Sequence, residues 1–402
     1  LEELISKKIL RIKVTDYMSR IPSVLSEFCK LYTKELPNVF ATSEDKFSTS
    51  DFNVEIDIVP YSHISDAIRG IEIVLGGSDY SVNISPDSKE DILILKVTGK
   101  KSIADYLSKE YLLGEIHFLL QTILFDQFPK PFIISSERTG AAIFRKELSF
   151  SRQRLLSEVN RNKLINPRDL LSKAYQDYPL PIKENLEFMG ALDSFAKKKS
   201  FIQKEHPEIL QDFADIIGGS YTLVSQDELR YTPQNYRRVK LSIDESSSAV
   251  RSLVDLGFYL KHVAEQDDLL IIDEPELNLH PENQRKIARL LTRLVNIGIK
   301  VLITTHSDYI IRELNTLIML NQDKPHLKKI MLDEGYKSEE LLSANKVKAY
   351  VAGSVVQKNR KTPYCTLTPM KVDPELGMEI SSFETTLDTM NRIQESIIWG
   401  AE

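Results

Sequence analysis

The chain has 402 residues, of which 42% are hydrophobic and 27% charged, and its 52 basic and 58 acidic side chains give a formal net charge of −6. This composition is that of a folded protein of about two or three lobes, and it excludes a wholly disordered or fibrous chain. No apolar run approaches the roughly 20 residues of a bilayer span, so we expect no membrane contact. The two cysteines, Cys29 and Cys365, have no metal-ligand spacing, which disfavours a disulfide framework or a zinc site and favours a cytoplasmic location.

Residues 1–140 are predicted to form a first lobe made of a helix, an antiparallel meander, a long helix and a buried strand. Apolar residues recur at helical spacing over 16–36, whereas alternation with period two is typical of strands. We predict strands from Asn53 to Ile58 and over 71–75, 80–84 and 92–97, then a helix over 102–128 and a strand over 132–134.

Residues 141–215 are predicted to form a helical insertion, because their periodicity is helical and broken mainly by prolines. Between Arg145 and Lys199 there are 12 basic and 7 acidic residues, a local charge of 12 − 7 = +5 in an acidic protein. Two interpretations remain open: a solvated helical face, or an arm that contacts DNA.

Residues 216–320 are predicted to form a second lobe with an α/β pattern. Strands are expected over 220–224, 238–243, 269–273 and 301–304, and helices over 247–263, 281–297 and 308–314. Short apolar strands that alternate with helices favour a parallel-strand core sheet. Residues 321–402 are assigned to a C-terminal segment that packs on this lobe.

The segment Leu269 to Glu276, with the sequence LLIIDEPE, is typical of a Walker B strand. Its apolar residues place Asp273 at the carboxyl end of a central strand, where open α/β sheets bind ligands. Asp273 is therefore the candidate Mg²⁺ ligand, and Glu274 the candidate base that polarises a water molecule attacking a γ-phosphate. The alternative is an ordinary turn after a strand.

Two further segments support a site at this edge of the sheet. The strand over 301–304 delivers Thr305 and His306 beside the Walker B strand, where a histidine can donate a hydrogen bond to a γ-phosphate. The loop that includes Asn278 and His280 precedes a helix with proline at its first position, and its place suits a loop that faces another subunit.

Ser246, Ser247 and Ser248 precede a predicted helix about 25 residues before the Walker B strand. Hydroxyls and free backbone N–H groups at a helix N-terminus form an anion site. The alternative is that one serine caps the helix and the others have no role.

Together these segments resemble the signature motif, Walker B, D-loop and H-loop of ABC-type ATPases. The nearest types are SMC and RecF-like proteins and the bacterial AAA-family ATPases related to the overcoming-lysogenization-defect (OLD) nucleases. Residues 134–140 also resemble a strand-end element of these ATPases, which implies that Arg138 contributes to cofactor binding, and residues 381–391 resemble their closing segment. The resemblance implies an ABC-type ATPase head, ATP and Mg²⁺ as cofactors, and a homodimer or higher oligomer that closes around ATP.

The chain also departs from this pattern. A P-loop, Gly-x4-Gly-Lys-Ser/Thr, is not found in the sequence. The nearest segment, Gly99 to Ser102, has the wrong spacing, so we expect the P-loop before Leu1. Serines also replace the usual glycines of the signature motif, which would hinder close backbone approach to a phosphate.

The resemblance implies an ATPase subunit that controls a separate effector, a Toprim or HNH nuclease, in bacterial anti-phage defence, as in the PARIS, Septu and retron-associated ATPases. Two alternatives remain open. One is a DNA-binding SMC/RecF-like ATPase of DNA repair or chromosome maintenance, and the other is a scaffold that does not bind nucleotide.

Overall fold

The computed structural model describes residues 9–13, 19–54, 72–74, 80–86, 92–99, 129–144, 178–225, 228–356, 363–379 and 381–399. The chain divides into two compact units, residues 1–129 and 130–402, which are described separately. The helix predicted over 102–128 and most of the basic stretch of the insertion lie outside the described residues. The finer division into four parts remains a prediction.

The first unit contains an antiparallel sheet with the strand order β1-β4-β3-β2. Its strands are β1 (Ile9–Lys13), β2 (Glu72–Val74), β3 (Tyr80–Pro86) and β4 (Ile92–Gly99). The predicted meander is thus confirmed for three strands, and β1 adds a fourth that the sequence pattern did not indicate. The strand predicted from Asn53 is not seen at its start, since residues 51–54 have no regular structure, and residues 55–58 lie outside the described residues.

The same unit carries a short helical segment in place of the single helix predicted over 16–36. It consists of α3 (Ile21–Tyr32), a 3-10 turn (Thr33–Glu35) and α4 (Leu36–Val39). The Thr33 hydroxyl donates to the Cys29 carbonyl at 2.8 Å where α3 ends, and Pro37 occupies the first turn of α4, where its missing N–H is tolerated.

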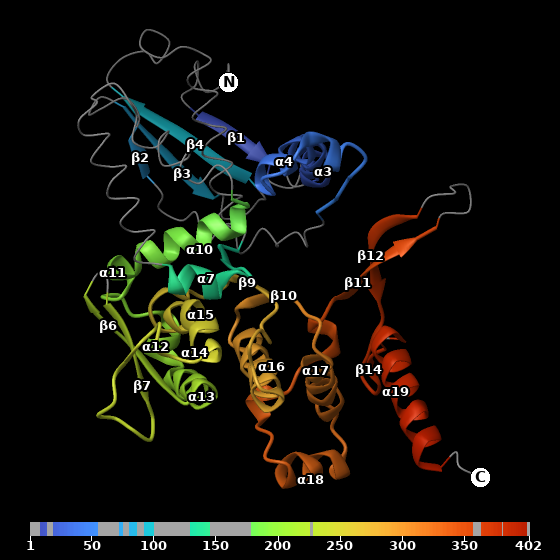
Figure 1. The fold of residues 1–402 in the computed structure, drawn as a ribbon. Coiled ribbons are helices and arrows are strands. Elements are labelled where there is room, and N and C mark those ends of the chain that lie inside the picture. The colour runs from blue at the N-terminus through green and yellow to red at the C-terminus, as the bar shows by residue number, and fades with distance from the viewer. Residues whose placement is uncertain are drawn as a thin grey trace. The chain divides into compact units, whose positions relative to one another are not determined.

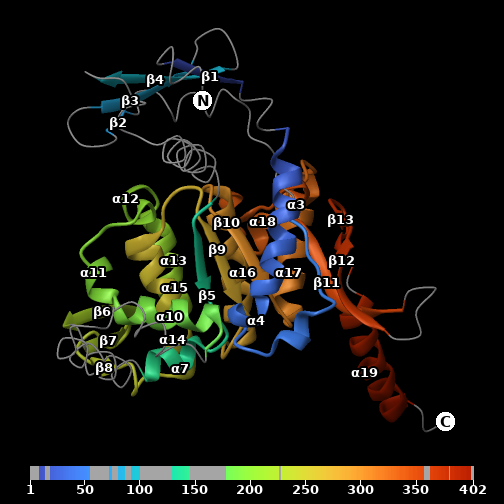
Figure 2. The same ribbon diagram turned by 90° about the horizontal axis from the view of Figure 1, so that it is seen from above.

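The second unit is organised around a parallel sheet with the order β10-β9-β5. Its strands are β5 (Pro131–Ile134), β9 (Leu269–Asp273) and β10 (Lys300–Thr304). Ile134 lies opposite Ile272, and Asp273 lies opposite Thr304, so the carboxyl ends of the three strands form one edge (Figure 2). The predicted mixed α/β fold with a parallel-strand core is therefore confirmed.

The helices that follow β5 build the largest apolar core of the described residues. They are α7 (Arg138–Ile143), α10 (Leu180–Gly190), α11 (Leu192–Phe195), α12 (Phe201–Glu205) and α13 (Pro207–Ile217). Their apolar faces pack with Leu270 and Ile272 of β9 and with α16 (Pro281–Asn296). The described part of the insertion is helical, as the sequence predicts.

A small antiparallel sheet with the order β6-β7-β8 precedes the serine-rich segment. Its strands are β6 (Gly219–Ser225), β7 (Glu228–Pro233) and β8 (Leu241–Ser242). β7 was not predicted, and the strand predicted over 238–243 shrinks to two residues.

The helix predicted over 247–263 is divided into α14 (Ser248–Ser252), α15 (Val254–Phe258) and a π-helical turn, η4 (Tyr259–Val263). Leu253 leaves helical geometry, with φ −108° and ψ 7°. Its side chain and that of Val254 are nonetheless buried in the core, so packing selects this break.

α16 follows β9 in the chain, and α17 (Asp308–Leu320) follows β10. The two helices lie side by side (Figure 1). α17 is longer than predicted, because Leu317 and Ile318 join a second apolar cluster with Tyr336, Leu342 and Met378. This cluster packs part of the C-terminal segment against α17.

The C-terminal segment consists of several short elements followed by a 19-residue helix. They are α18 (Pro325–Asp333), the 3-10 turns η5 (Ser338–Glu340) and η6 (Ala344–Lys346), the hairpin β11 (Ala349–Val355) and β12 (Tyr364–Met370), the pair β13 (Val372–Asp373) and β14 (Gly377–Met378), and α19 (Ser381–Trp399). A search of the described residues finds no helix with the length and apolarity to cross a membrane.

Candidate active site at the carboxyl edge of the parallel sheet

Asp273 and Thr304 end neighbouring strands and meet at this edge. They are paired in the parallel register, and the Thr304 hydroxyl donates a hydrogen bond to Oδ1 of Asp273. Oδ2 of Asp273 has no hydrogen bond to a described residue. Asp273 is half-buried, so one carboxylate oxygen remains available to a ligand at the sheet edge.

Glu274 is held in a backbone conformation that side chains other than glycine rarely adopt, with φ +49°. Its N–H donates to the Thr304 carbonyl at 3.1 Å, and its carbonyl accepts from Nη2 of Arg138 at 2.6 Å. A left-handed residue costs about 1–3 kcal/mol and persists only where its surroundings hold it, which is common at active sites. The clamp on both sides of Glu274 meets this requirement.

Arg138 holds the carboxyl end of β9 through its hydrogen bonds to backbone carbonyls. Its side chain is 1% exposed, and Nη1 donates to the carbonyls of Asp273 at 2.7 Å and Ser135 at 2.9 Å. Nε donates to the Ser252 carbonyl at 2.7 Å. Burial lowers the pKa of the guanidinium from its ordinary value, and the nearby Asp255 carboxylate opposes this shift. The geometry makes Arg138 a brace between β5, α14 and the Asp273–Glu274 peptide, with most of its donors already engaged.

Glu276 joins the Walker B loop to the start of α17. Its Oε1 accepts from the Thr305 hydroxyl at 2.8 Å and from the backbone N–H of His306 at 2.7 Å. These contacts fix the backbone at His306, while the imidazole itself is exposed. Glu276 was not among the predicted site residues, although its place two residues after Glu274 was a usable signal.

The predicted D-loop has two solvent-exposed polar side chains on either side of a buried leucine. Asn278 and His280 are exposed, whereas Leu279 between them is 7% exposed and belongs to the core. Nδ1 of His280 accepts from the Glu282 N–H at 3.3 Å and so caps α16. The Ser252 hydroxyl donates to the Leu277 carbonyl at 3.1 Å and connects this loop to α14.

The three predicted serines have different surroundings. Ser246 is buried, and its hydroxyl donates to the Ser242 carbonyl at 2.8 Å. Ser247 is the N-cap of α14 and accepts from the Val250 N–H at 3.3 Å. Ser248 is exposed. The cap reading is thus confirmed for Ser247, and the anion site remains a prediction for Ser247 and Ser248, which are exposed.

A buried carboxyl group that the sequence analysis missed lies beneath the site. Asp255 is 2% exposed, and neither of its oxygens has a hydrogen-bond partner among the described residues. Burial raises its pKa to about 7, and the Arg138 guanidinium limits the shift. No sequence pattern distinguishes Asp255 from an ordinary helical acid, because its burial depends on packing.

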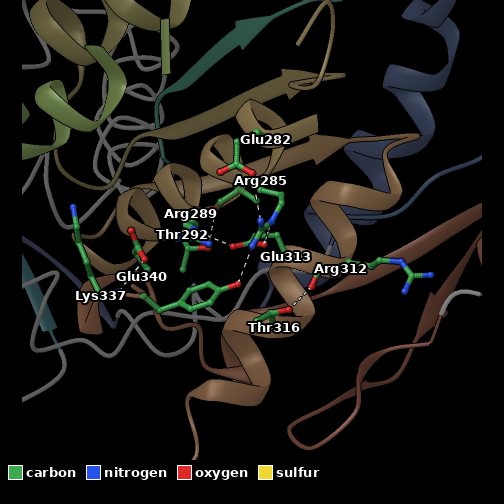
Figure 3. Close-up of polar contacts among 11 residues, drawn as sticks. Glu282, Arg285, Arg289, Thr292, Arg312, Glu313, Thr316, Lys337 and Glu340 are labelled. Atoms are coloured by element: carbon green, nitrogen blue, oxygen red, sulfur yellow. Dashed lines mark hydrogen bonds and ion pairs between the residues drawn. The ribbon is translucent and has the colours of Figure 1, made fainter. Parts of the chain in front are cut away.

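The helices that begin after the D-loop and after His306 are tied together by polar contacts (Figure 3). Glu313 of α17 is 3% exposed and accepts from Nε of Arg285 at 2.7 Å and Nε of Arg289 at 2.5 Å. Nearer the site, the Ser307 hydroxyl donates to Oε1 of Gln284 at 2.5 Å. The contacts of Glu313 and of Ser307 with α16 therefore fix the position of α17. They also fix the position of His306, which directly precedes Ser307.

The side chains at the edge fit a nucleotide with Mg²⁺ in their donor chemistry. Carboxylate and hydroxyl oxygens are suitable Mg²⁺ ligands, and a site that uses one or two carboxylates plus substrate phosphates is common. Among the described residues no cluster of three or more His, Cys, Asp or Glu side chains forms a metal cage.

The structure brings the predicted residues from four segments to one region. Asp273, Glu274, Thr305 and His306 share contacts at the sheet edge, directly or through Glu276. The D-loop is connected to α14, which follows Ser247, by the Ser252 hydroxyl.

Comparison with known proteins identifies the same part of the chain. Residues 144–311 match a family model described as an AAA ATPase domain, so this region is similar to the ATPases of that family and its likeness implies nucleotide binding. No curated protein matches the chain.

Two solved structures resemble parts of the chain. One comes from work described as structural biochemistry of ATP-driven dimerization and DNA-stimulated activation of SMC ATPases; it is 14% identical, with a TM-score of 0.24, over 48% of this chain and 95% of that one. The other is an Smc head domain with an extended coiled coil bound to the C-terminal domain of ScpA, derived from Pyrococcus furiosus. It is 17% identical, with a TM-score of 0.22, over 44% of this chain and 48% of that one.

Proposed function

We propose that this protein is an ABC-type ATPase that closes as a homodimer around ATP and thereby controls a separate effector. The observation that carries the proposal is the convergence of Asp273, Glu274 and His306 at the carboxyl edge of a parallel sheet, inside the region that matches an AAA ATPase domain. Ligands of open α/β sheets bind at this edge.

In this proposal each residue has a separate task. Asp273 would hold Mg²⁺, which would neutralise phosphate charge when bound. Glu274 accepts a proton from the attacking water, and its clamped backbone positions the carboxylate for this. The exposed His306 donates a hydrogen bond to the γ-phosphate, with its backbone held by Glu276.

The other half of each site would come from a second copy of the chain. Ser247 and Ser248 are exposed at the start of α14, and in the closed dimer they would face the nucleotide held by Asp273 of the other copy. A two-fold dimer would create two equivalent sites. ATP binding then favours the closed state because ATP contacts both copies only there.

The proposed effector is a separate nuclease subunit. The resemblance of the DEPE segment and its neighbours to anti-phage ATPases supports a Toprim or HNH nuclease as the controlled partner. Co-purification of the native protein with such a nuclease, lost when closure is blocked, would test it. The DNA-contacting arm predicted within 145–199 also remains a prediction.

The test of the ATPase assignment is ATP turnover by the full protein and by Glu274→Gln. We expect a loss of at least about 100-fold, because general-base catalysis contributes about 10²–10⁴-fold. The variant should also remain dimeric in ATP under conditions where the wild type returns to monomer.

The matched control is Glu339→Gln, the same chemical change at an exposed position in η5. It should turn over ATP at the wild-type rate. Equal turnover by Glu274→Gln and Glu339→Gln would contradict the assignment.

A further inference from the structure

The loop between β7 and β8 is exposed and basic. All residues from 234 to 240 are exposed, and the Tyr236 side chain is 68% exposed. The loop contains Arg237, Arg238 and Lys240, and the segment 229–243 around it contains no acidic residue, although the whole chain has a net charge of −6. A local concentration of positive charge on one loop of an acidic protein indicates an anionic partner.

The three cations of this loop have no side-chain partner among the residues that the structure describes. Arg230 on β7 is paired with Glu228, with 2.7 Å between Nε and Oε1. By contrast, Arg237, Arg238 and Lys240 form no ion pair or side-chain hydrogen bond with any described residue. Of the acids that follow the loop, Glu245 accepts from the Ser242 N–H at 2.8 Å, and Asp244 is exposed.

The backbone of the loop is nevertheless ordered by hydrogen bonds. The N–H of Gln234 donates to the Gly218 carbonyl at 2.8 Å, and the N–H of Val239 donates to the Tyr236 carbonyl at 2.8 Å. The loop is thus anchored to the end of α13 and folded into turns. An ordered loop loses less conformational entropy on binding than a flexible one. The free-energy cost of ordering this loop around a ligand is therefore small.

We propose that this loop binds single-stranded nucleic acid. Arg237, Arg238 and Lys240 contact backbone phosphates, for which a guanidinium offers paired donors. Tyr236 stacks on an unpaired base, which a duplex would keep inside its own stack. The aromatic side chain among the cations is the reason to favour a single strand over a duplex or an acidic protein.

The loop lies close in sequence to the serines of the proposed ATP site, but its proposed binding of nucleic acid does not depend on that site. β8 follows the loop directly, and Nη1 of Arg251 in α14 donates to the Asp244 carbonyl at 3.3 Å. The loop proposed to bind the nucleic-acid strand ends only a few residues before Ser247 in the sequence. Binding in the absence of ATP tests the inference even if the protein proves not to hydrolyse ATP.

The experiment measures the affinity of the full protein, without nucleotide, for a fluorescently labelled oligo-dT and a duplex of equal length at several salt concentrations. The triple variant Arg237→Gln, Arg238→Gln, Lys240→Gln should bind oligo-dT at least about 10-fold more weakly. Its slope of log affinity against log salt should be smaller by about 2, since each phosphate contact on a single strand contributes about 0.7. Tyr236→Ala should weaken binding about 5-fold or more with an unchanged salt slope, because stacking releases no counterions.

The matched control is Lys328→Gln, Lys329→Gln, Lys348→Gln, which removes the same charge from three exposed lysines in α18 and just before β11. It should retain wild-type affinity. The proposal is overturned if the wild type does not bind oligo-dT at low salt, or if the lysine variant loses binding while the loop variant does not. Equal affinity for the duplex together with no effect of Tyr236→Ala would overturn the single-strand assignment.

Discussion

The carboxyl edge of the parallel sheet and the start of α14 both carry polar side chains predicted to contact ATP, but the two regions differ in the hydrogen bonds that hold these residues. At the sheet edge the Asp273 carboxylate and the backbones of Glu274 and His306 are held by neighbouring elements. At the start of α14, the Ser247 hydroxyl accepts from the Val250 N–H of its own helix, and Ser248 is exposed. The comparison indicates that one half of the proposed site is assembled within a single chain, whereas the other half is presented outward.

The two regions are nonetheless joined beneath the surface. Arg138 contacts the carbonyls of both Ser252 and Asp273, and the Ser252 hydroxyl reaches the D-loop. A movement of α14 would therefore be transmitted to the Walker B end through buried hydrogen bonds. The following predictions test this difference between a braced edge and a presented helix start.

The largest expected effect follows from removing the brace. Arg138→Met should lower the free energy of unfolding by about 3 kcal/mol or more, because it leaves several buried carbonyls without a donor and each costs about 1–3 kcal/mol. Denaturant unfolding measures this loss. Arg237→Met, the same change in an exposed loop, should alter stability by less than about 0.5 kcal/mol. Similar small effects at both positions would mean that the sheet edge is not held by Arg138.

A smaller effect is expected from the buried carboxyl beneath the brace. The pKa of Asp255 is raised from an ordinary 3.8 to about 7, so between these values the folded protein keeps a proton that the unfolded chain releases. Its contribution to stability therefore falls as pH rises through this window and is constant above it.

Asp255→Asn should remove this dependence. Relative to wild type, the variant should gain about 1–3 kcal/mol in the free energy of unfolding between pH 5 and pH 8, since each pKa unit corresponds to about 1.4 kcal/mol. Denaturant unfolding at the two pH values measures the difference. Parallel pH profiles for the two proteins would show that Asp255 is not held protonated in the fold.

The smallest effect is expected at the helix start. Ser247→Ala should reduce stability by about 1 kcal/mol through loss of the N-cap, and Ser248→Ala by less than about 0.5 kcal/mol. ATP turnover of the two variants then separates capping from ligand binding. Lower turnover in Ser248→Ala at unchanged stability would support a presented ligand, and wild-type turnover would remove Ser248 from the proposed site.

Several elements were predictable because their signals are local. The strands β9 and β10 follow from short apolar runs, and the start of α16 follows from Pro281 and Glu282 after a polar loop. Other elements were missed because their stability depends on distant partners. β1 pairs with β4 across a sequence separation of 79 to 87 residues, and the interruption at Leu253 results from packing rather than from a glycine or proline.

The amino-acid sequence by itself determined which residue types arrive at the end of each strand, since apolar runs and the polar residues after them are properties of neighbouring positions. Only the tertiary structure decided what those residues do with their hydrogen-bonding groups. Arg138 is a brace because burial leaves its guanidinium no water to bond, so its donors find carbonyl partners on distant segments. Glu276 is a link because the fold brings the backbone N–H of His306 within hydrogen-bond distance of its Oε1.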